Sequence, residues 1–267
     1  MKTITLSIDF ETDWGGRAKT CYGIKQAMPA VLDMLERKGI KATIFVSGVC
    51  IEDNKDIIKR IIDCGHEIAC HGFSHKSFAD MSQDQIVSEL RLWKDTLKKI
   101  SWYEAVGFRA PQFRTSEALY RALKDEGFIY DSSVVPSKMP FRYNNKAAAS
   151  EPYMLQDGLL EIPVSLIPIV RLPKGLLWAN LMGPGLYKRL ASLADESHVT
   201  MYMHPFDLLR TKPKAGHSPH VKAWYGFKAG ESKKTLAKMI DYWIPRRKFV
   251  TLRELAAQSK DAKKQVR

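Results

Sequence analysis

Two kinds of hydrophobic spacing alternate along this chain. Over residues 3–11 every second residue is apolar, with polar or acidic residues between, which is the period of a β-strand with two different faces. Over residues 26–37 the apolar residues recur every three or four positions, which is typical of an amphipathic helix, and Gly39 ends it. A strand over residues 41–48 then completes one β-α-β unit.

The same alternation continues to the end of the chain. Ser82 begins one helix, and Gln85 three residues later predicts a capping box. Further helices are expected at residues 54–63, 116–125 and 232–243, and further strands at 66–70, 105–110, 128–133, 160–164, 199–204 and 248–252. Seven or eight strands separated by helices predict an α/β fold with a parallel sheet closed into a barrel, in a single domain. We interpret the polar stretch 207–230 as an excursion near the C-terminal ends of the strands.

Side-chain parity predicts what the barrel encloses. On the first strand the polar residues share one face, while Ile4, Leu6, Ile8 and Phe10 share the other. Because the helix-facing side of a barrel strand is apolar, the polar face should point inward, with its last members at the C-terminal ends where α/β sites lie. The residues expected to converge there are Asp9, Glu11, His71, Arg109 and His204.

Composition narrows the class of protein. The 267 residues have a hydrophobic content of 45% and a net charge of +13. The basic residues are scattered, with clusters only at 245–249 and in a basic tail at 259–267, and no nucleic-acid module accompanies them, so we predict no nucleic-acid partner. Four cysteines without framework spacing, no signal peptide and no apolar run near the roughly 18 residues of a membrane span predict a cytoplasmic chain with reduced thiols.

The stretch "HGFSH", His71 to His75, is the strongest local motif. Two histidines four residues apart can present ring nitrogens to one divalent ion, although two capping or surface histidines would give the same spacing. A catalytic site needs a third ligand and an open position for water, and Glu11 and Asp9 face the same lumen two residues apart. One carboxylate can bind the metal while the other takes a proton from water, which predicts metal-assisted hydrolysis.

Five stretches, in order, resemble the polysaccharide deacetylase family, which is carbohydrate esterase family four with the NodB homology fold. They are "SIDFE" (7–11), "HGFSH" (71–75), "FRAPQF" (108–113), "YDSS" (130–133) and "MYMHP" (201–205). The resemblance implies a distorted seven-stranded (β/α) barrel whose catalytic domain spans residues 1–258. It also implies a divalent metal cofactor, with Zn²⁺ expected first and Co²⁺, Mn²⁺ or Ni²⁺ as alternatives.

The family's pattern also implies roles for residues of this chain. Asp9 corresponds to the general base, and His71 and His75 to metal ligands that act together with a second carboxylate. Arg109 corresponds to the residue that orients the base, and His204 to the acid that protonates the leaving amine. The backbone amide of Gln112, which follows the motif's proline, would help to stabilise the oxyanion.

Two departures from the family's pattern affect these expectations. Many members carry adjacent aspartates in the first motif, whereas here the second acid is Glu11, two residues after Asp9. Parity favours Glu11 as the third ligand, and Asp13, which lies beyond the strand, is the alternative. Gln112 stands where an aromatic residue is common, which predicts a differently shaped groove.

The remaining candidates have two interpretations each. Asp131 is assigned to substrate binding because it could orient His204, or it could cap a turn with the two serines that follow it. Among the aromatic residues that could line a sugar groove, we select Phe73 and Phe113, although Trp178, Trp224 and Tyr225 are further candidates and any of these could serve as core or loop anchors.

The expected activity is removal of an N-acyl group, first of all acetyl, from an amino sugar. The alternatives are a deformylase or deacetylase of a lipid-linked amino sugar, a ureide amidohydrolase of the same fold, and a sugar-binding protein without activity. Residues 165–190 mix apolar and basic residues, which suits a peripheral contact with an anionic membrane or lipid-linked substrate, a buried segment, or a contact in a homo-oligomer.

Overall fold

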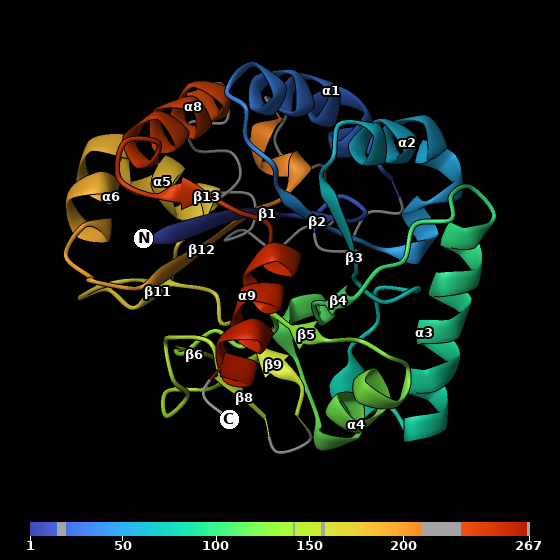
Figure 1. Ribbon diagram of the computed structural model, residues 1–267. Helices are drawn as coiled ribbons and strands as arrows, with labels where there is room; N and C mark the ends of the chain where they lie inside the picture. Colours follow the sequence, from blue (N-terminus) through green and yellow to red (C-terminus); the bar gives the residue numbers. More distant parts are fainter. Residues whose placement is uncertain (15–19, 141, 156–157, 210–230, 266–267) are drawn as a thin grey trace.

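A curled sheet forms the centre of the molecule (Figure 1). The computed structural model describes residues 1–14, 20–140, 142–155, 158–209 and 231–265. The sheet has nine strands, and the order along its main path is β12-β1-β2-β3-β4-β5-β9-β8, with β13 paired beside β1. Their bounds are β1 Thr3–Phe10, β2 Thr43–Val46, β3 Glu67–Cys70, β4 Gly107–Phe108, β5 Tyr130–Asp131, β8 Tyr153–Met154, β9 Leu160–Glu161, β12 His198–Met203 and β13 Lys248–Phe249.

The sheet is parallel except at one edge. Every pair along the path from β12 to β9 is parallel, and only β8 runs antiparallel to its neighbour β9. The segment after β9 returns to β12, because the Ser165 N–H donates to Thr200 O (3.1 Å) and the Tyr202 N–H donates to Lys174 O (3.0 Å). The predicted α/β fold is confirmed as a curled, largely parallel sheet in a single domain. Its nine strands exceed the expected seven or eight because β8 was not predicted, whereas β13 corresponds to the strand expected at 248–252.

Helices surround the outside of this sheet. Figure 1 shows α8, α1, α2, α3 and α4 following one another around it, with α5 and α6 beside α8. Their bounds are α1 Tyr22–Arg37, α2 Lys55–Asp63, α3 Gln83–Lys98, α4 Glu117–Asp125, α5 Leu176–Met182, α6 Pro184–Ala191 and α8 Ser232–Trp243. The capping box predicted at Ser82 and Gln85 is present, and α8 has the bounds expected from its apolar spacing. Helix α1 begins four residues earlier than predicted.

The two faces of β1 separate as their parity predicted. Ile4, Leu6, Ile8 and Phe10 are buried in the main hydrophobic core together with the apolar face of α1. On the other face, the Ser7 hydroxyl donates to Met201 O (2.8 Å) and lies within hydrogen-bonding distance of Arg109. The polar face of β1 therefore points into the curl of the sheet.

The N-terminal ends of the strands are closed by the last helix, α9 (Leu252–Gln265). Leu252, Leu255 and Ala256 pack in a second apolar cluster with residues from inside the sheet, including Phe45 and Tyr130. In Figure 1, α9 lies across the middle of the ring of strands. Helix α9 continues past residue 258 to Gln265. With this end occupied by apolar side chains, the polar residues of the interior are left for the opposite end.

Residues 165–190 form a hairpin and two helices. Strands β10 (Leu166–Ile167) and β11 (Leu172–Pro173) are antiparallel, and α5 and α6 follow. Lys174, one of the basic residues of this segment, is fully buried and forms an ion pair with Glu196. The segment is therefore built largely into the fold, while Ile169 at the hairpin tip is 77% exposed.

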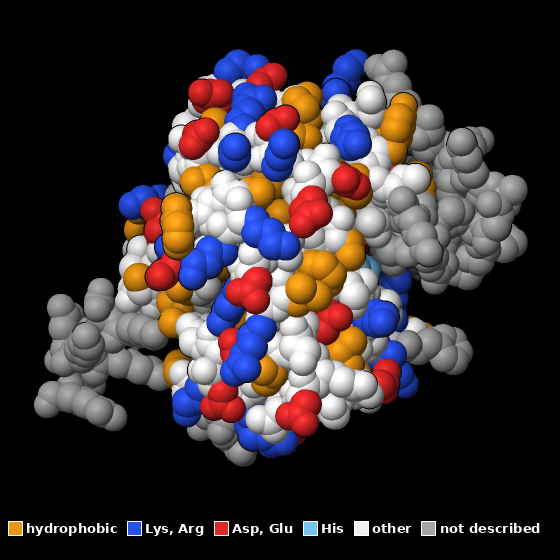
Figure 2. Space-filling view, turned by 90° about the vertical axis from the view of Figure 1, so that its right-hand side faces the viewer, with side chains coloured by type: hydrophobic (Ala, Val, Ile, Leu, Met, Phe, Trp, Pro, Cys, Tyr) orange, Lys and Arg blue, Asp and Glu red, His pale blue; other side chains and the backbone are white. Residues whose placement is uncertain are grey.

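The surface carries both signs of charge. On the face in Figure 2, Lys and Arg side chains are interspersed with Asp and Glu rather than gathered into one patch. Among the described helices, none is long and apolar enough to cross a membrane. Residues 210–230, which include most of the predicted polar excursion with Trp224 and Tyr225, lie outside the described part of the chain.

Candidate metal centre and active site

Glu11, His71 and His75 come together at the C-terminal ends of β1 and β3. Their ligand atoms lie within 4.8 Å of one another, and all three residues are buried. Glu11 Oε2 lies 3.1 Å from His71 Nε2 and also contacts His75 Nε2. The third carboxylate candidate, Asp13, points elsewhere and accepts the backbone N–H groups of Tyr22 and Gly23 at the start of α1 (2.7 and 2.8 Å).

The hydrogen bonds of His71 suit it to bind a cation. Its Nδ1 lies 2.8 Å from the backbone oxygen of Arg109, and because a carbonyl oxygen can only accept, Nδ1 carries the hydrogen. The Nε2 atom of His71 then faces the Glu11 carboxylate at 3.1 Å, where both groups can act as ligands. A divalent cation satisfies both, and two histidines with one carboxylate form a ligand set that zinc enzymes use. The residues present therefore fit a metal ion.

The ionisation of Glu11 supports the same interpretation. Burial by itself would raise the pKa of Glu11, but the neighbouring His75, His71 and His204 lower it well below its usual value. Burial would lower the pKa of His75, and Glu11 raises it. Glu11 is thus held as a carboxylate, which is the form that binds metal.

Backbone geometry at the strand ends is strained. Four residues other than glycine adopt left-handed backbone conformations in the loops that follow β1, β3 and β4: Trp14, His75, Gln112 and Phe113, with φ between 58° and 61°. Such conformations cost about 1–3 kcal/mol each and gather at functional sites. For His75, this conformation belongs to the turn that brings its ring beside His71.

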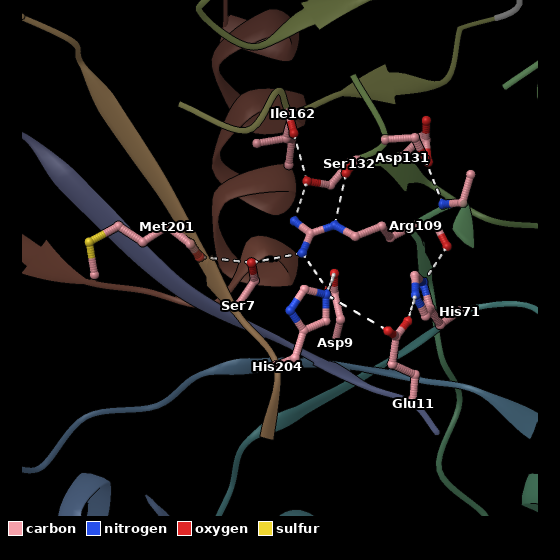
Figure 3. A network of polar contacts seen from close by, with 12 residues as sticks. Ser7, Asp9, Glu11, His71, Arg109, Asp131, Ser132, Ile162, Met201 and His204 are labelled. Carbon is pink, nitrogen blue, oxygen red and sulfur yellow. Dashed lines mark hydrogen bonds and ion pairs between the residues drawn. The ribbon is translucent and has the colours of Figure 1, made fainter. Parts of the chain in front are cut away.

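Asp9 lies beside the metal residues and is fixed by Arg109 (Figure 3). Arg109 Nη1 donates to Asp9 Oδ1 (2.7 Å) and to Ser7 Oγ (2.9 Å). Its other donors reach Ser132, with Nε to the backbone oxygen (2.9 Å) and Nη2 to the hydroxyl (3.0 Å). The fully buried guanidinium also stacks 4.1 Å from the centre of the Phe45 ring. These contacts fix the guanidinium of Arg109 in place, and the guanidinium in turn fixes the Asp9 carboxylate.

His204 faces Asp9 and Glu11 from the end of β12. Its Nε2 lies 3.9 Å from Asp9 Oδ2 and 3.8 Å from Glu11 Oε1. On its other side Nδ1 lies 3.4 Å from Asp207 Oδ2, and the His204 N–H donates to the same oxygen (2.8 Å). The ring stacks on Phe206 with centres 4.5 Å apart. The Asp9 and Glu11 carboxylates thus both lie within 4 Å of the His204 ring nitrogen.

The neighbours of His204 favour its charged form. Burial would lower the pKa of His204, but Asp207, Glu11 and Asp9 raise it to about 9. Its main carboxylate contact, Asp207, was missed by sequence reasoning. The signal available was its position three residues after His204 in a turn that begins with proline, which suits a carboxylate that caps the turn.

The other predicted residues have different surroundings. Phe113 is buried and makes edge-to-face contacts with Tyr202 and Tyr143, with ring centres 5.4 and 6.4 Å apart. Phe73 is partly buried against the core, and its backbone N–H donates to Glu89 (3.2 Å). Gln112 is exposed in η4 (Pro111–Phe113), directly after the strand end that carries Arg109.

Asp131 is wholly buried and bonds to its own turn. The Ser133 hydroxyl donates to Asp131 Oδ1 (2.6 Å) and accepts from the Ala110 N–H (2.7 Å). This geometry matches the turn-capping alternative, and the carboxylate beside His204 is Asp207. Ser132, in the same motif, instead contributes two acceptors to Arg109.

Residues 2–130 match the model of a known family, polysaccharide deacetylase. The N-terminal half of the chain is therefore similar to the polysaccharide deacetylase family. The match includes Asp9, Glu11, His71, His75 and Arg109, and it ends before the segment that carries His204.

Individual relatives agree with this assignment. The chain is 33% identical over 101 residues to the peptidoglycan-N-acetylmuramic acid deacetylase PdaA of Bacillus subtilis, a stretch covering 38% of each protein. It is 30% identical over 108 residues to a peptidoglycan deacetylase of Helicobacter pylori, covering 40% of this chain and 37% of the relative. The matched region thus spans less than half the length of these curated relatives.

The fold likeness extends over nearly the whole chain. A Mycobacterium smegmatis protein assigned to the polysaccharide deacetylases aligns with a TM-score of 0.68 at 20% identity, covering 98% of this chain and 92% of the other. The structure of Bacillus subtilis PdaA, a family 4 carbohydrate esterase, aligns with a TM-score of 0.58 at 18% identity, covering 97% and 82%. The C-terminal half, beyond the family match, therefore has the fold of these proteins as well.

Proposed function

We propose that this chain is a metal-dependent hydrolase that removes an N-acyl group, first of all acetyl, from an amino sugar in a glycan or glycoconjugate. The observation that carries the proposal is the joint placement of a Glu11–His71–His75 ligand set, the Arg109-bound Asp9 and His204 at one end of the sheet. The named relatives are peptidoglycan deacetylases, which supports an amide of an amino sugar as the substrate.

Glu11, His71 and His75 would hold the metal ion, with Zn²⁺ as the first expectation and Co²⁺, Mn²⁺ or Ni²⁺ as alternatives. When bound, such an ion acts as a Lewis acid that activates water and polarises the amide carbonyl. All three ligands are buried, so the ion would be shielded on the protein side, and substrate would approach from the side of His204, whose side chain is 17% exposed.

Asp9 is the proposed general base. Arg109 occupies Oδ1, which leaves Oδ2 to accept a proton from the attacking water. His204 is the proposed acid, and its raised pKa keeps it protonated at neutral pH, ready to donate from Nε2 to the leaving amine nitrogen. The amide of Gln112 remains the proposed oxyanion donor, and Phe73 and Phe113 remain the proposed groove residues. Asp131 is proposed to act on substrate binding only indirectly, by holding the Ser133 hydroxyl that accepts the Ala110 N–H.

The decisive experiment is a mass-spectrometric screen of N-acylated amino sugars that are free, nucleotide-linked, lipid-linked or polymeric, with a ureide panel beside them. Loss of one acyl group with added Zn²⁺ and not after chelation is expected. Full activity in chelator-treated, metal-free protein contradicts the mechanism, and hydrolysis of ureides alone contradicts the substrate class.

Variants separate the roles. Asp9→Asn and His204→Ala should lower kcat by about 10²–10⁴-fold while the metal stays bound. His71→Ala and His75→Ala should instead lose the metal, measured by calorimetric titration. His66→Gln is the matched control, because His66 is also a buried histidine but lies at the opposite end of β3.

A further inference from the structure

Two cysteines from segments distant in the sequence lie in contact with each other. Cys21 precedes α1, and Cys50 ends η1 (Gly48–Cys50), and their thiols are hydrogen-bonded with a Sγ–Sγ distance of 3.4 Å. Cys50 is fully buried, whereas Cys21 is partly exposed. Neither residue has a part in the proposed hydrolysis.

The surroundings give the two sulfurs different reactivity. The hydrogen bond from Cys50 lowers the pKa of Cys21 to about 7, against the effect of burial, and a hydrogen bond with Asn54 acts in the same direction. The hydrogen bond to Cys21 and burial raise the pKa of Cys50. Cys21 is thus the more accessible and more acidic thiol and Cys50 the buried one, which is the arrangement of a reactive cysteine with a resolving partner.

Both cysteines belong to segments that support the site. At the start of α1, Gly23 packs so closely that an added Cβ would lie 2.8 Å from Asp13 Oδ1 and 2.8 Å from Phe206 N. Asp13 belongs to the loop that follows Glu11, and the ring of Phe206 stacks on His204. In η1, an added Cβ on Gly48 would lie 2.2 Å from the Phe73 ring, between the two metal-binding histidines. Gly48 N–H also donates to Gly72 O (2.9 Å).

We propose that Cys21 and Cys50 form a redox site that hydroperoxides oxidise to a disulfide, and that this bond weakens the metal centre reversibly. Formation of the disulfide does not depend on the proposed function, whereas its effect on the metal centre rests on that function. A disulfide requires the sulfurs to approach from 3.4 Å to about 2.05 Å. Because α1 and η1 are packed against the loops of Glu11 and His71, this approach moves one of those loops.

The chemistry balances with hydrogen peroxide as the oxidant. The Cys21 thiolate attacks one peroxide oxygen and breaks the O–O bond, which gives a sulfenic acid and, with one proton, water. The Cys50 sulfur then attacks the sulfenic sulfur, forming the S–S bond and displacing hydroxide, which leaves with the Cys50 proton as a second water. The two thiols together lose two electrons, and the peroxide gains them.

The test is peroxide treatment of the full chain followed by non-reducing tryptic digestion and mass spectrometry. The expected product joins residues 20–25, which contain Cys21, to residues 42–55, which contain Cys50, with two hydrogens lost. Cys64 is the internal reference, since it is also partly exposed and has no cysteine in contact with it among the described residues. Oxidation of Cys64 while Cys21 and Cys50 stay reduced overturns the proposal.

The second measurement is Zn²⁺ affinity, which needs no substrate. The oxidised chain should bind Zn²⁺ about tenfold more weakly than the reduced chain, as when supporting contacts of metal ligands are disturbed, and dithiothreitol should restore the affinity. Cys21→Ser and Cys50→Ser should not respond to peroxide, and Cys64→Ser should respond like the unaltered chain. A disulfide that leaves Zn²⁺ affinity unchanged overturns the switch, and neither readout depends on which substrate is hydrolysed.

Discussion

His204 lies between carboxylates on two sides, and they affect it differently. Asp9 and Glu11 face its Nε2 from 3.9 and 3.8 Å, where the proposed reaction takes place, whereas Asp207 contacts Nδ1 from behind. Once a cation neutralises Glu11, Asp207 is the carboxylate that continues to favour the charged ring. Asp207 is therefore the residue through which the pKa of the proposed acid can be changed without altering the proposed metal ligands.

We expect Asp207→Asn to shift the pH profile of activity. The protonated form of His204 is the proposed acid, so activity is expected to fall as pH rises through its pKa. Removing the Asp207 charge lowers that pKa, so the alkaline limb of kcat should move to lower pH by about one unit. Asp195→Asn, at an exposed carboxylate, is the control. An unchanged limb in Asp207→Asn, with the fold intact, would show that Asp207 has no such role.

At the scale of elements, β5 and β9 place two buried carboxyl groups opposite each other. Asp131 and Glu161 are partners in the parallel register, and each has one buried carboxyl oxygen, Asp131 Oδ2 and Glu161 Oε2, with no partner among the described residues other than the opposite carboxyl group. Burial raises the pKa of both, and the Asp131 charge raises that of Glu161 further, well above its usual value. Glu161 is therefore the protonated member and donates to Asp131, while its Oε1 accepts the Val134 N–H (3.0 Å).

This pair predicts a contrast between two substitutions at one position. Glu161→Gln keeps a neutral donor toward Asp131 and an acceptor for Val134, so the free energy of unfolding should fall by less than about 1 kcal/mol. Glu161→Leu removes the donor toward Asp131 and the acceptor for the Val134 N–H, and it leaves Asp131 with only the Ser133 hydroxyl as a side-chain donor. The free energy of unfolding should then fall by about 3 kcal/mol. Urea unfolding at neutral pH measures both. Equal losses for the two variants would mean that no proton is shared.

At the scale of the whole molecule, stability in acid depends on buried neutral histidines. His198 and His66 lie at the N-terminal ends of β12 and β3, and burial lowers their pKa values to about 3 and about 4. The unfolded chain takes up these protons near pH 6.5, whereas the folded chain takes them up only below those values. The unfolded state thus binds more protons in that window, so stability falls as pH drops through it.

His198→Asn tests this expectation. In the unaltered chain, lowering the pH from 7 to 4.5 should cost about 2 kcal/mol through His198 alone, and the variant should lose that much less over the same interval. The free energy of unfolding in urea is measured for both chains at both pH values. Because the pH-dependent loss in one chain is subtracted from the loss in the other, the contribution of the histidines at the candidate metal site cancels. Parallel losses in both chains would contradict a neutral His198 in the fold.

How much of the fold could be predicted depended on element length. The long amphipathic helices and β1 carried enough repeats of their period to be placed within a few residues. Strands such as β4, β5 and β9 are two residues long, and the hairpin β10–β11 and helices α5 and α6 were not predicted at all. Such short elements have no period of their own, because their conformation is imposed by the packing around them.

The sequence by itself determined which residues could take part in the chemistry. The alternation of β1 put Asp9 and Glu11 on one face, the spacing of "HGFSH" paired two histidines, and the order of five motifs indicated the family. Only the tertiary structure shows that Glu11 lies beside the two histidines while Asp13 binds the N-terminus of α1, because both are acids near a strand end and the packing of that helix separates them. It also decided that Asp207 supports His204 and that Cys21 meets Cys50, since such contacts depend on how loops distant in sequence fold against one another.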